Sequence, residues 1–351
     1  MKMLFLALVL SVLPFQLQAE TKPIVLGYCM IWSNPDLTQI RYENFTHLAY
    51  AFLETNPDGN VAFYKPEHAA QFVKLAHAKG VKALLSLGGS GSGEAFTSLM
   101  KDPKAVERYI EKVLSIVKEH GFDGLDVDWE HPRSQEDKQN QAQLIKKFRQ
   151  GLPKNALISM AVTGTHWAAQ WLDEKTLLPL VDFLNVMTYD MHGPWDEHAG
   201  YNSPLHATSE DTVDGRYFSF DAMMDYWTGQ KHWPKEKLNV GIPLYGYGYA
   251  VTSWGEKPDG QSAHSSIAYR DIPGLLKDGW QRVWDGEACV PYLKKDGVQE
   301  LITYDDPESV ALKGEWTRKN GYRGIFFWEI SQDRIDGDNA LVVSARKGFL
   351  K

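Results

Sequence analysis

Apolar and polar positions change their spacing repeatedly along this chain. Short, nearly continuous apolar runs end at Gly, Pro or polar residues, which is typical of parallel strands that are buried on both faces. Between most of these runs lie longer stretches with apolar residues at helical spacing. The runs predict strands at Ile24–Cys29, His47–Phe52, Lys82–Gly89, Gly124–Glu130, Leu157–Thr163, Phe183–Asp190, Leu238–Tyr245 and Gly324–Ser331.

The intervening stretches predict helices, and the alternation of the two patterns predicts the fold class. Strand and helix alternate through eight strands, which indicates an α/β fold of the (β/α)₈ TIM barrel type. A doubly wound open sheet is the alternative, and polar groups at successive strand ends favour the barrel. The predicted helices are Glu67–Lys79, Ala105–His120, Ser134–Gln150, Asp221–Gly229, Pro307–Asn320 and Asp336–Gly348.

One long interval interrupts this alternation. Residues 246–306 separate strand 7 from helix 7, are rich in Gly, Tyr, Ser and Trp, and contain hairpin-like runs at Gln281–Trp284 and Glu300–Tyr304. We expect a small α+β insertion subdomain that deepens a cleft on the C-terminal face of the barrel. The interval Met191–Phe218 is also long, and we expect it to form a loop on the substrate side.

The N-terminus has the features of a targeting segment. A weakly basic start precedes an apolar run, Leu4–Leu13, that is too short to span a bilayer, and Ala19 offers a small residue for cleavage. Residues 1–19 are therefore predicted to be a signal peptide, and residues 20–351 the catalytic barrel. We expect a secreted protein, periplasmic or extracellular, with no membrane anchor once the signal is removed.

Composition narrows the range of partners. The formal net charge is −8 and no basic patch is visible, so we expect no nucleic-acid partner. The 12 Trp, 16 Tyr and 15 Phe favour a carbohydrate ligand, because aromatic faces stack on sugar rings, although most of them are expected in the core. Cys29 and Cys289 could pair in an exported protein, but two free thiols are favoured.

The run from Gly121 to Glu130 carries an unusual set of carboxyls. In a strand, Asp126, Asp128 and Glu130 share one face, and the three residues between them place large apolar groups on the other. Like charges this close raise at least one pKa, which suits general acid catalysis. A solvated edge strand and a Ca²⁺ or Mg²⁺ ligand set are the alternatives.

Other strand ends add groups that suit a sugar site. Barrel enzymes collect their chemistry at the C-terminal ends of the strands. Glu130 is outermost in the acidic run and is the expected proton donor, with Asp128 and Asp126 below it. No carboxylate is placed as a nucleophile, so the substrate is expected to supply its own from a 2-acetamido group. Beyond the acidic run, the strand ends carry Tyr28, Phe52, Ser86, Met187, Tyr189, Asp190, Tyr245 and Trp328.

The motif Asp123-Gly-Leu-Asp126-Val-Asp128-Trp-Glu130 resembles the signature of glycoside hydrolase family 18, the chitinases and their relatives. The resemblance extends over essentially the whole chain after the predicted signal. Four further motifs match in order: Ser86-Leu-Gly88-Gly89, Met187-Thr-Tyr189-Asp190, Gly241-Ile-Pro243-Leu-Tyr245-Gly246 and Gly324-Ile-Phe-Phe-Trp328-Glu329.

The resemblance implies specific roles without a metal or cofactor. Glu130 would protonate the leaving oxygen and then activate water, and Asp128 would move between Asp126 and the acetamido nitrogen. Tyr189 would hydrogen-bond the acetamido oxygen, and the product would retain the β configuration. Ser86 would lie beneath Asp126 in the proton network. The residues expected on the substrate-binding side are Asp190, Trp328, Met187, Ser86, Phe52, Tyr28 and Tyr245.

Two departures from the family pattern affect the expected substrate. Ser90-Gly91-Ser92-Gly93 stands where processive relatives often have a Trp after the Gly pair, and His131 stands where many have Tyr. We expect His131 and His192 to be packing residues. These departures, and the lack of a visible carbohydrate-binding module, favour soluble chitin oligomers or accessible chains over crystalline chitin.

The leading hypothesis is a secreted, monomeric chitinase that cleaves β-1,4 bonds between N-acetylglucosamine units through an oxazolinium ion. An endo-β-N-acetylglucosaminidase acting on N-glycans or peptidoglycan-type glycans is an alternative. A non-catalytic chitin-binding lectin is a third hypothesis, which the presence of Glu130, Asp128 and Tyr189 disfavours. Endo or exo action and processivity are left open by the sequence.

Overall fold

The computed structural model describes residues 22–209, 212–213, 216–335 and 338–351. Within these ranges, eight parallel strands close into a barrel, because β1 (Ile24–Met30) pairs with both β2 (His47–Thr55) and β16 (Gly324–Trp328). The TIM-barrel prediction is therefore confirmed. The other barrel strands are β4 (Lys82–Gly89), β5 (Gly124–Trp129), β6 (Leu157–Thr163), β7 (Phe183–Met187) and β10 (Leu238–Pro243), and β3 (Val61–Ala62) adds an antiparallel pairing to β2.

Two predicted strands end three residues earlier in the structure than in the prediction, and β10 and β5 end two residues and one residue earlier. β7 stops at Met187 rather than Asp190, because Asp190 adopts φ +56°, a left-handed conformation that cannot continue a strand. β16 stops at Trp328 rather than Ser331, because Ile330–Asp333 forms a short 3₁₀ turn, η6. In both cases the residues that follow the strand turn at the rim of the barrel.

The longer helices agree with their predicted positions, within a few residues. α3 begins at Pro103 instead of Ala105, because Asp102 caps it and accepts a hydrogen bond from the Lys104 amide at 2.9 Å. The predicted start at Asp336 lies outside the described residues, and α10 begins at Ala340. The helices are α1 (Pro66–Ala78), α2 (Gly93–Leu99), α3 (Pro103–His120), α4 (Gln135–Gly151), α5 (His166–Ala169), α6 (Glu174–Leu177), α7 (Phe220–Asp225), α8 (Ile272–Lys277), α9 (Pro307–Lys319) and α10 (Ala340–Leu350).

Shorter elements connect these parts at the rim of the barrel. They are η1 (Leu37–Gln39), η2 (Tyr42–Asn44), a π-turn η3 (Tyr226–Gln230), η4 (Lys235–Lys237), η5 (Tyr269–Asp271), and the two-residue strands β8 (Thr212–Val213), β9 (Arg216–Tyr217), β17 (Arg334–Ile335) and β18 (Asp338–Asn339).

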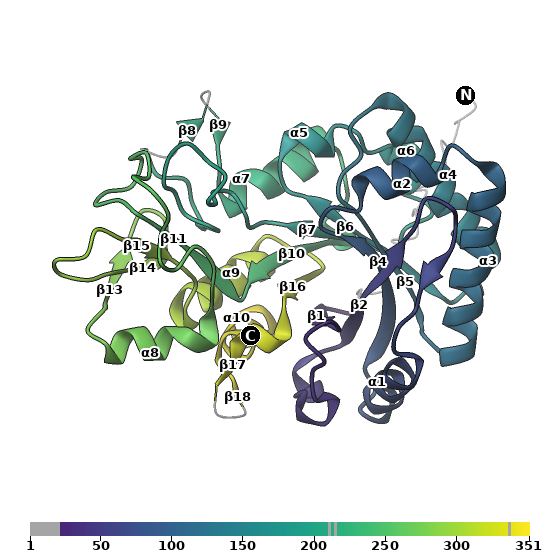
Figure 1. Ribbon diagram of the computed structural model, residues 1–351, viewed down its shortest axis with the longest axis horizontal. Coiled ribbons are helices and arrows are strands. Elements are labelled where there is room, and N and C mark those ends of the chain that lie inside the picture. The colour runs from purple at the N-terminus through teal and green to yellow at the C-terminus, as the bar shows by residue number, and fades with distance from the viewer. Residues whose placement is uncertain (1–21, 210–211, 214–215, 336–337) are drawn as a thin grey trace, which may run out of the picture.

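A second, antiparallel sheet lies in the predicted insertion. In Figure 1 it stands at the left, on the other side of the barrel from α1 and α3. The strand at Val290–Lys294 was not predicted. It pairs with the strands that form at both predicted hairpin-like runs, Gln281–Trp284 and Glu300–Tyr304. A small apolar core that includes Trp280 and Ile302 packs beneath the sheet. In sheet order the strands are β12 (Ile267–Ala268), β11 (Tyr245–Tyr249), β15 (Leu301–Thr303), β14 (Val290–Lys294) and β13 (Gln281–Asp285).

The described part of the chain also answers two compositional questions. Cys29 is buried, Cys289 is partly exposed, and both are free thiols, as favoured from the sequence. Across the described residues, no helix combines the length and apolar character needed to cross a bilayer.

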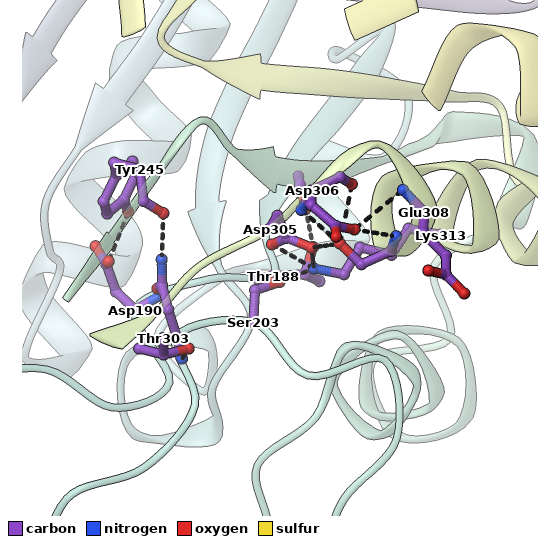
Figure 2. A network of polar contacts seen from close by, with 12 residues as sticks. Thr188, Asp190, Ser203, Tyr245, Thr303, Asp305, Asp306, Glu308 and Lys313 are labelled. Atoms are coloured by element: carbon purple, nitrogen blue, oxygen red, sulfur yellow. Dashed lines mark hydrogen bonds and ion pairs between the residues drawn. The ribbon is translucent and has the colours of Figure 1, made fainter. Parts of the chain in front are cut away.

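A hydrogen-bond network around a buried ion pair connects α9 to the loop that follows β7 (Figure 2). The Lys313 ammonium donates to both carboxylate oxygens of Asp305 at 2.6 and 2.7 Å, and both side chains are almost fully buried. The same ammonium donates to the Ser203 hydroxyl at 3.0 Å, which donates in turn to the Thr188 carbonyl at 2.7 Å. Since Thr188 directly precedes Tyr189, this network supports the rim of the barrel at the predicted site.

The ion pair should be stabilising only as a pair. Lys313→Met leaves the Asp305 carboxylate buried without its counter-charge, so the free energy of unfolding in urea should fall by roughly 3–5 kcal/mol. The double variant Asp305→Asn/Lys313→Met removes both charges and should recover most of that loss.

Lys319→Met is the matched control, because Lys319 pairs with Glu315 on the exposed side of the same helix. It should leave the unfolding midpoint unchanged. A Lys313→Met single variant as stable as the double variant would show that the buried charges do not depend on each other.

Candidate active site

The barrel strands end at a cavity of about 770 Å³. Most of the side chains predicted for the site line it: Tyr28, Phe52, Asp128, Glu130, Met187, Tyr189, Asp190 and Trp328. The other three predicted residues, Ser86, Asp126 and Tyr245, are not among its lining residues and are buried behind its wall. The structure thus separates the predicted set into groups that a ligand can touch and groups that support them.

Asp126 is fully buried at the centre of the barrel and is held from several strands at once. Its Oδ2 accepts hydrogen bonds from the Tyr28 hydroxyl at 2.9 Å and the Ser86 hydroxyl at 2.7 Å. Its Oδ1 accepts from the Ser159 hydroxyl at 2.6 Å and the Asn185 amide at 3.2 Å. Burial raises the pKa of Asp126, and these donors oppose the rise by stabilising the ionised form.

Asp128 lies one pleat nearer the cavity and faces Glu130. Asp128 is 3% exposed, and its Oδ1 has no hydrogen-bond partner among the described residues. Burial raises the pKa of Asp128 far above its usual range, and the charges of Glu130 and Asp126 raise it further. A side-chain hydrogen bond between Asp128 and Glu130 also raises the pKa of Asp128 and lowers the pKa of Glu130.

Glu130 follows β5 directly, at the cavity surface. Its backbone amide donates to the Ser92 hydroxyl at 3.1 Å, and its carbonyl accepts from the Gly93 amide at 2.9 Å. Burial raises the pKa of Glu130 to about 7, and the charge of Asp190 adds to the rise. The hydrogen bond from Asp128 acts in the opposite direction. A carboxyl with this pKa can both donate and accept a proton near neutral pH.

The end of β7 contributes a tyrosine and a carboxylate. Among the described residues nothing hydrogen-bonds to the Tyr189 hydroxyl, which lines the cavity. Burial raises the pKa of Tyr189 well above 10.0, so the hydroxyl keeps its proton and can donate it to a ligand oxygen. Asp190 accepts hydrogen bonds from the hydroxyls of Tyr245 at 2.6 Å and Tyr247 at 2.8 Å. Figure 2 shows Asp190 beside Tyr245.

The left-handed backbone at Asp190 is held in place by Asn202. The Asp190 amide donates to the Asn202 side-chain oxygen at 2.8 Å, and the Asn202 side-chain amide donates to the Tyr245 carbonyl at 3.1 Å. Asp190 is accessible from the cavity. Desolvation of its carboxyl by the surrounding protein nevertheless raises its pKa, and the hydroxyls of Tyr245 and Tyr247 oppose this rise. These hydrogen bonds therefore fix the orientation of the Asp190 carboxylate without any ligand.

Aromatic rings form a row along one side of the cavity. Trp328 stacks on Phe52 with centroids 5.5 Å apart, and Phe52 stacks on Trp32 at 6.1 Å. Trp32 is 59% exposed, and Tyr64, which lines the same side, is 72% exposed. Exposed aromatic faces in a row are typical of a surface that receives successive sugar rings.

Two glycines at the end of β4 allow this close packing. Gly88 has φ +100°, and a Cβ there would lie 2.2 Å from the Asp128 carbonyl oxygen. Gly89 has φ +90°, and its Cβ would lie 2.4 Å from the Phe52 ring. Any larger residue would move Asp128 or Phe52. Glycine is therefore needed at both positions, because neighbouring atoms lie too close for a side chain and because φ is positive.

His192 and His131 both pack against neighbouring side chains. His192 is buried and contacts Asp196 through Nδ1 at 3.1 Å. His131 has its Nε2 3.7 Å from the Glu130 carboxylate and packs edge-on against Trp167. Burial lowers the pKa of His131 to about 4, with the Arg133 charge adding to the effect, so the imidazole is neutral near pH 7.

Several residues of the site had not been selected from the sequence. Ser159 and Asn185 hold Asp126: Asn185 is the one polar residue of β7, and Ser159 is the one polar residue inside β6, which ends at Thr163, a signal that could have identified them. Tyr247 binds Asp190 from the second sheet. Trp32 and Trp167 lie on rim segments without a periodic pattern, so no comparable signal marks them.

The alternative interpretation of the acidic run as a metal-ligand set requires a cluster of ligating side chains. In the ranges that the structure describes, no group of three or more His, Cys, Asp or Glu side chains could hold a metal ion.

Comparison with known proteins identifies the family. Residues 24–333 match the model of Glycosyl hydrolases family 18. A probable endochitinase of Caenorhabditis elegans is 31% identical over 82% of this chain, and an oviduct-specific glycoprotein of Papio anubis is 30% identical over 83%. The chain spans about half the length of these two relatives, 51% and 50%.

Solved structures agree with that match. The Ostrinia furnacalis Group IV chitinase in complex with allosamidin superposes with a TM-score of 0.86 at 27% identity, covering 93% of this chain and 98% of that one. The fold, the motif order and the geometry of the acidic strand therefore agree with one assignment: the chain belongs to Glycosyl hydrolases family 18.

Proposed function

We propose that this protein is a chitinase that hydrolyses β-1,4 bonds between N-acetylglucosamine units, with Glu130 as the acid. The observation that carries the proposal is the buried row Asp126, Asp128 and Glu130, which ends in a carboxyl with a pKa of about 7 at the cavity surface. Family membership alone does not decide the activity, because the similar relatives carry different names.

The carboxyls of the cavity support a substrate-assisted reaction. A retaining enzyme with a protein nucleophile needs a second carboxylate about 5 Å from the acid, across the bond. Asp128 lies on β5, two residues before Glu130 and on the same side of the bond, and Asp190 is held by two tyrosine hydroxyls. We infer that the carbonyl oxygen of the substrate's 2-acetamido group attacks the anomeric carbon, which gives a cyclic oxazolinium ion.

Each supporting residue has a part in this reaction. Glu130 donates its proton to the glycosidic oxygen as the bond to the anomeric carbon breaks, and the resulting carboxylate then accepts a proton from the attacking water. Asp128 accepts the acetamido N–H and balances the positive charge of the ion. Tyr189 donates to the acetamido oxygen and orients it, and Trp328 forms the floor beneath the ring. Asp126, fixed by its donors, orients Asp128.

The substrate class follows from the same contacts. A sugar without the acetamido group would leave the Asp128 carboxyl and the Tyr189 hydroxyl without partners in a buried site, which costs binding energy. We therefore propose chitin oligomers and accessible chitin chains as substrates. Export by residues 1–19, which lie outside the described residues, and a monomeric state remain predictions.

Replacing the acid should separate catalysis from binding. Glu130→Gln keeps the shape of the side chain but cannot donate a proton, so kcat on chitin hexamer should fall by about 10²–10⁴-fold. Calorimetry should show that the variant still binds the hexamer.

Asp333→Asn is the control, because Asp333 is a carboxyl whose pKa is also raised to about 7, and it is fully buried and caps α10 away from the cavity. It should keep kcat within about twofold of wild type. Binding of the hexamer by the wild type without release of any product would favour the lectin hypothesis instead.

The pH dependence of kcat/KM should report the acid. Glu130 must be protonated to act, and its raised pKa of about 7 means that kcat/KM should fall about tenfold per unit above pH 7. The negative charge of Asp190 raises this pKa, so Asp190→Asn should move the alkaline limb to lower pH. An alkaline limb that stays in place in Asp190→Asn, measured with the same substrate, would contradict this assignment.

A further inference from the structure

A second cavity of about 460 Å³ adjoins the first at Glu130. The two cavities share Glu130, Met187, Tyr189 and Asp190 in their walls. The second is completed by residues at the end of β6 and in the segments that follow β5, β6 and β7: His131, Thr163, Thr165, Trp167, Met191, His192, Trp195, Asp196 and Phe218. Together the cavities form a groove that passes over the proposed acid.

The two halves of this groove can be assigned to the two sides of the scissile bond, an assignment that rests on the proposed function. Trp328 and Asp128 line the first cavity and do not line the second. The sugar with the reacting acetamido group must therefore lie in the first cavity. Glu130 borders both cavities, so the glycosidic oxygen lies at their junction. The leaving-group sugars then occupy the second cavity.

Trp167 is an exposed aromatic in that leaving-group half. It lies on α5, immediately after β6, and 48% of its surface is exposed. The Arg133 guanidinium lies over the Trp167 ring, 5.9 Å from its centroid, and the His131 ring meets it edge-on at 5.1 Å. A large ring held in place by two neighbours loses little conformational freedom when a ligand stacks on it.

The segment after the Gly88–Gly89 pair, residues 90–93, contains no aromatic ring on which a leaving-group sugar could stack. Ser92 there accepts from the Glu130 amide and donates to the Asp128 carbonyl, both at 3.1 Å, so its hydroxyl supports the backbone of the acid. We propose that Trp167, held by Arg133 and His131, is a platform for the leaving-group sugars and contributes to setting the number of sugars accepted on that side of the bond.

The matched comparison is with Trp32, an exposed tryptophan of the opposite half. The wild type, Trp167→Ala, Trp167→Phe and Trp32→Ala should be compared on chitin hexamer and on a chitobioside with a small aryl leaving group. Trp167→Ala should reduce kcat/KM on the hexamer by about threefold to tenfold, the contribution of one aromatic contact. On the aryl chitobioside, whose leaving group is one small ring, it should stay within about twofold of wild type.

The cleavage pattern of a hexamer labelled at its reducing end is the second readout. A general loss of structure would lower the rate but would not shift the cleaved bonds in one direction. Trp167→Ala should shift cleavage towards bonds that leave fewer sugars on the reducing side, Trp167→Phe should restore much of the wild-type pattern, and Trp32→Ala should shift cleavage in the opposite direction. An unchanged pattern in Trp167→Ala would overturn the inference. A wild type that cleaves neither substrate would instead overturn the proposed function.

Discussion

The structure depends on the burial of three carboxyls along one barrel strand. Charges placed in a protein interior are costly unless other groups compensate them, and here each carboxyl is compensated differently. Asp126 accepts hydrogen bonds from side chains on β1, β4, β6 and β7, so one carboxyl connects five strands of the barrel. In the described part of the chain, Asp128 Oδ1 has no donor, and burial together with the charges of Glu130 and Asp126 raises the pKa of Asp128. In the proposed reaction, the proton of Glu130 is held at the cavity surface, where the glycosidic oxygen would receive it.

The groups around this row hold it in a fixed geometry. Gly88 and Gly89 let Asp128 and Phe52 approach β4, and Asn202 fixes the backbone that carries Asp190. The second sheet contributes the hydroxyls of two tyrosines, so the insertion is part of the site as well as its wall. The network from Lys313 reaches the same segment from behind. The end of β7 is therefore held from the insertion, from a helix and from its own loop.

The barrel and the acidic row could be predicted from the sequence because both depend on spacing. Continuous apolar runs indicate strands buried on both faces, and a period of two places Asp126, Asp128 and Glu130 together. The ends of β7 and β16 could not be predicted, because the residues that follow, Thr188-Tyr189-Asp190 and Glu329-Ile330-Ser331, alternate polar and apolar as a strand would, past the point where the backbone turns. The short helices, including α5, contain too few residues to show a helical period.

The binding surface was the least predictable part of the site. Trp32 and Trp167 face a groove that forms only when separate strand ends meet, and in sequence they do not differ from core aromatics. Ser159 and Asn185 are different, because a lone polar residue in an apolar strand must find a partner inside the barrel. That partner is Asp126, which the sequence had already singled out for its place in the acidic row.

The central claim is that the substrate's acetamido oxygen, and no carboxylate of the protein, is the nucleophile. The most direct test measures kcat/KM on aryl chitobiosides in which the N-acetyl group of the reacting sugar carries zero, one, two or three fluorines. Fluorine withdraws electrons from the carbonyl oxygen without changing Glu130 or the leaving group. A steep fall with each added fluorine is the expected result. A rate that does not depend on the number of fluorines would contradict the claim, because a nucleophile from the protein or from water would then be attacking.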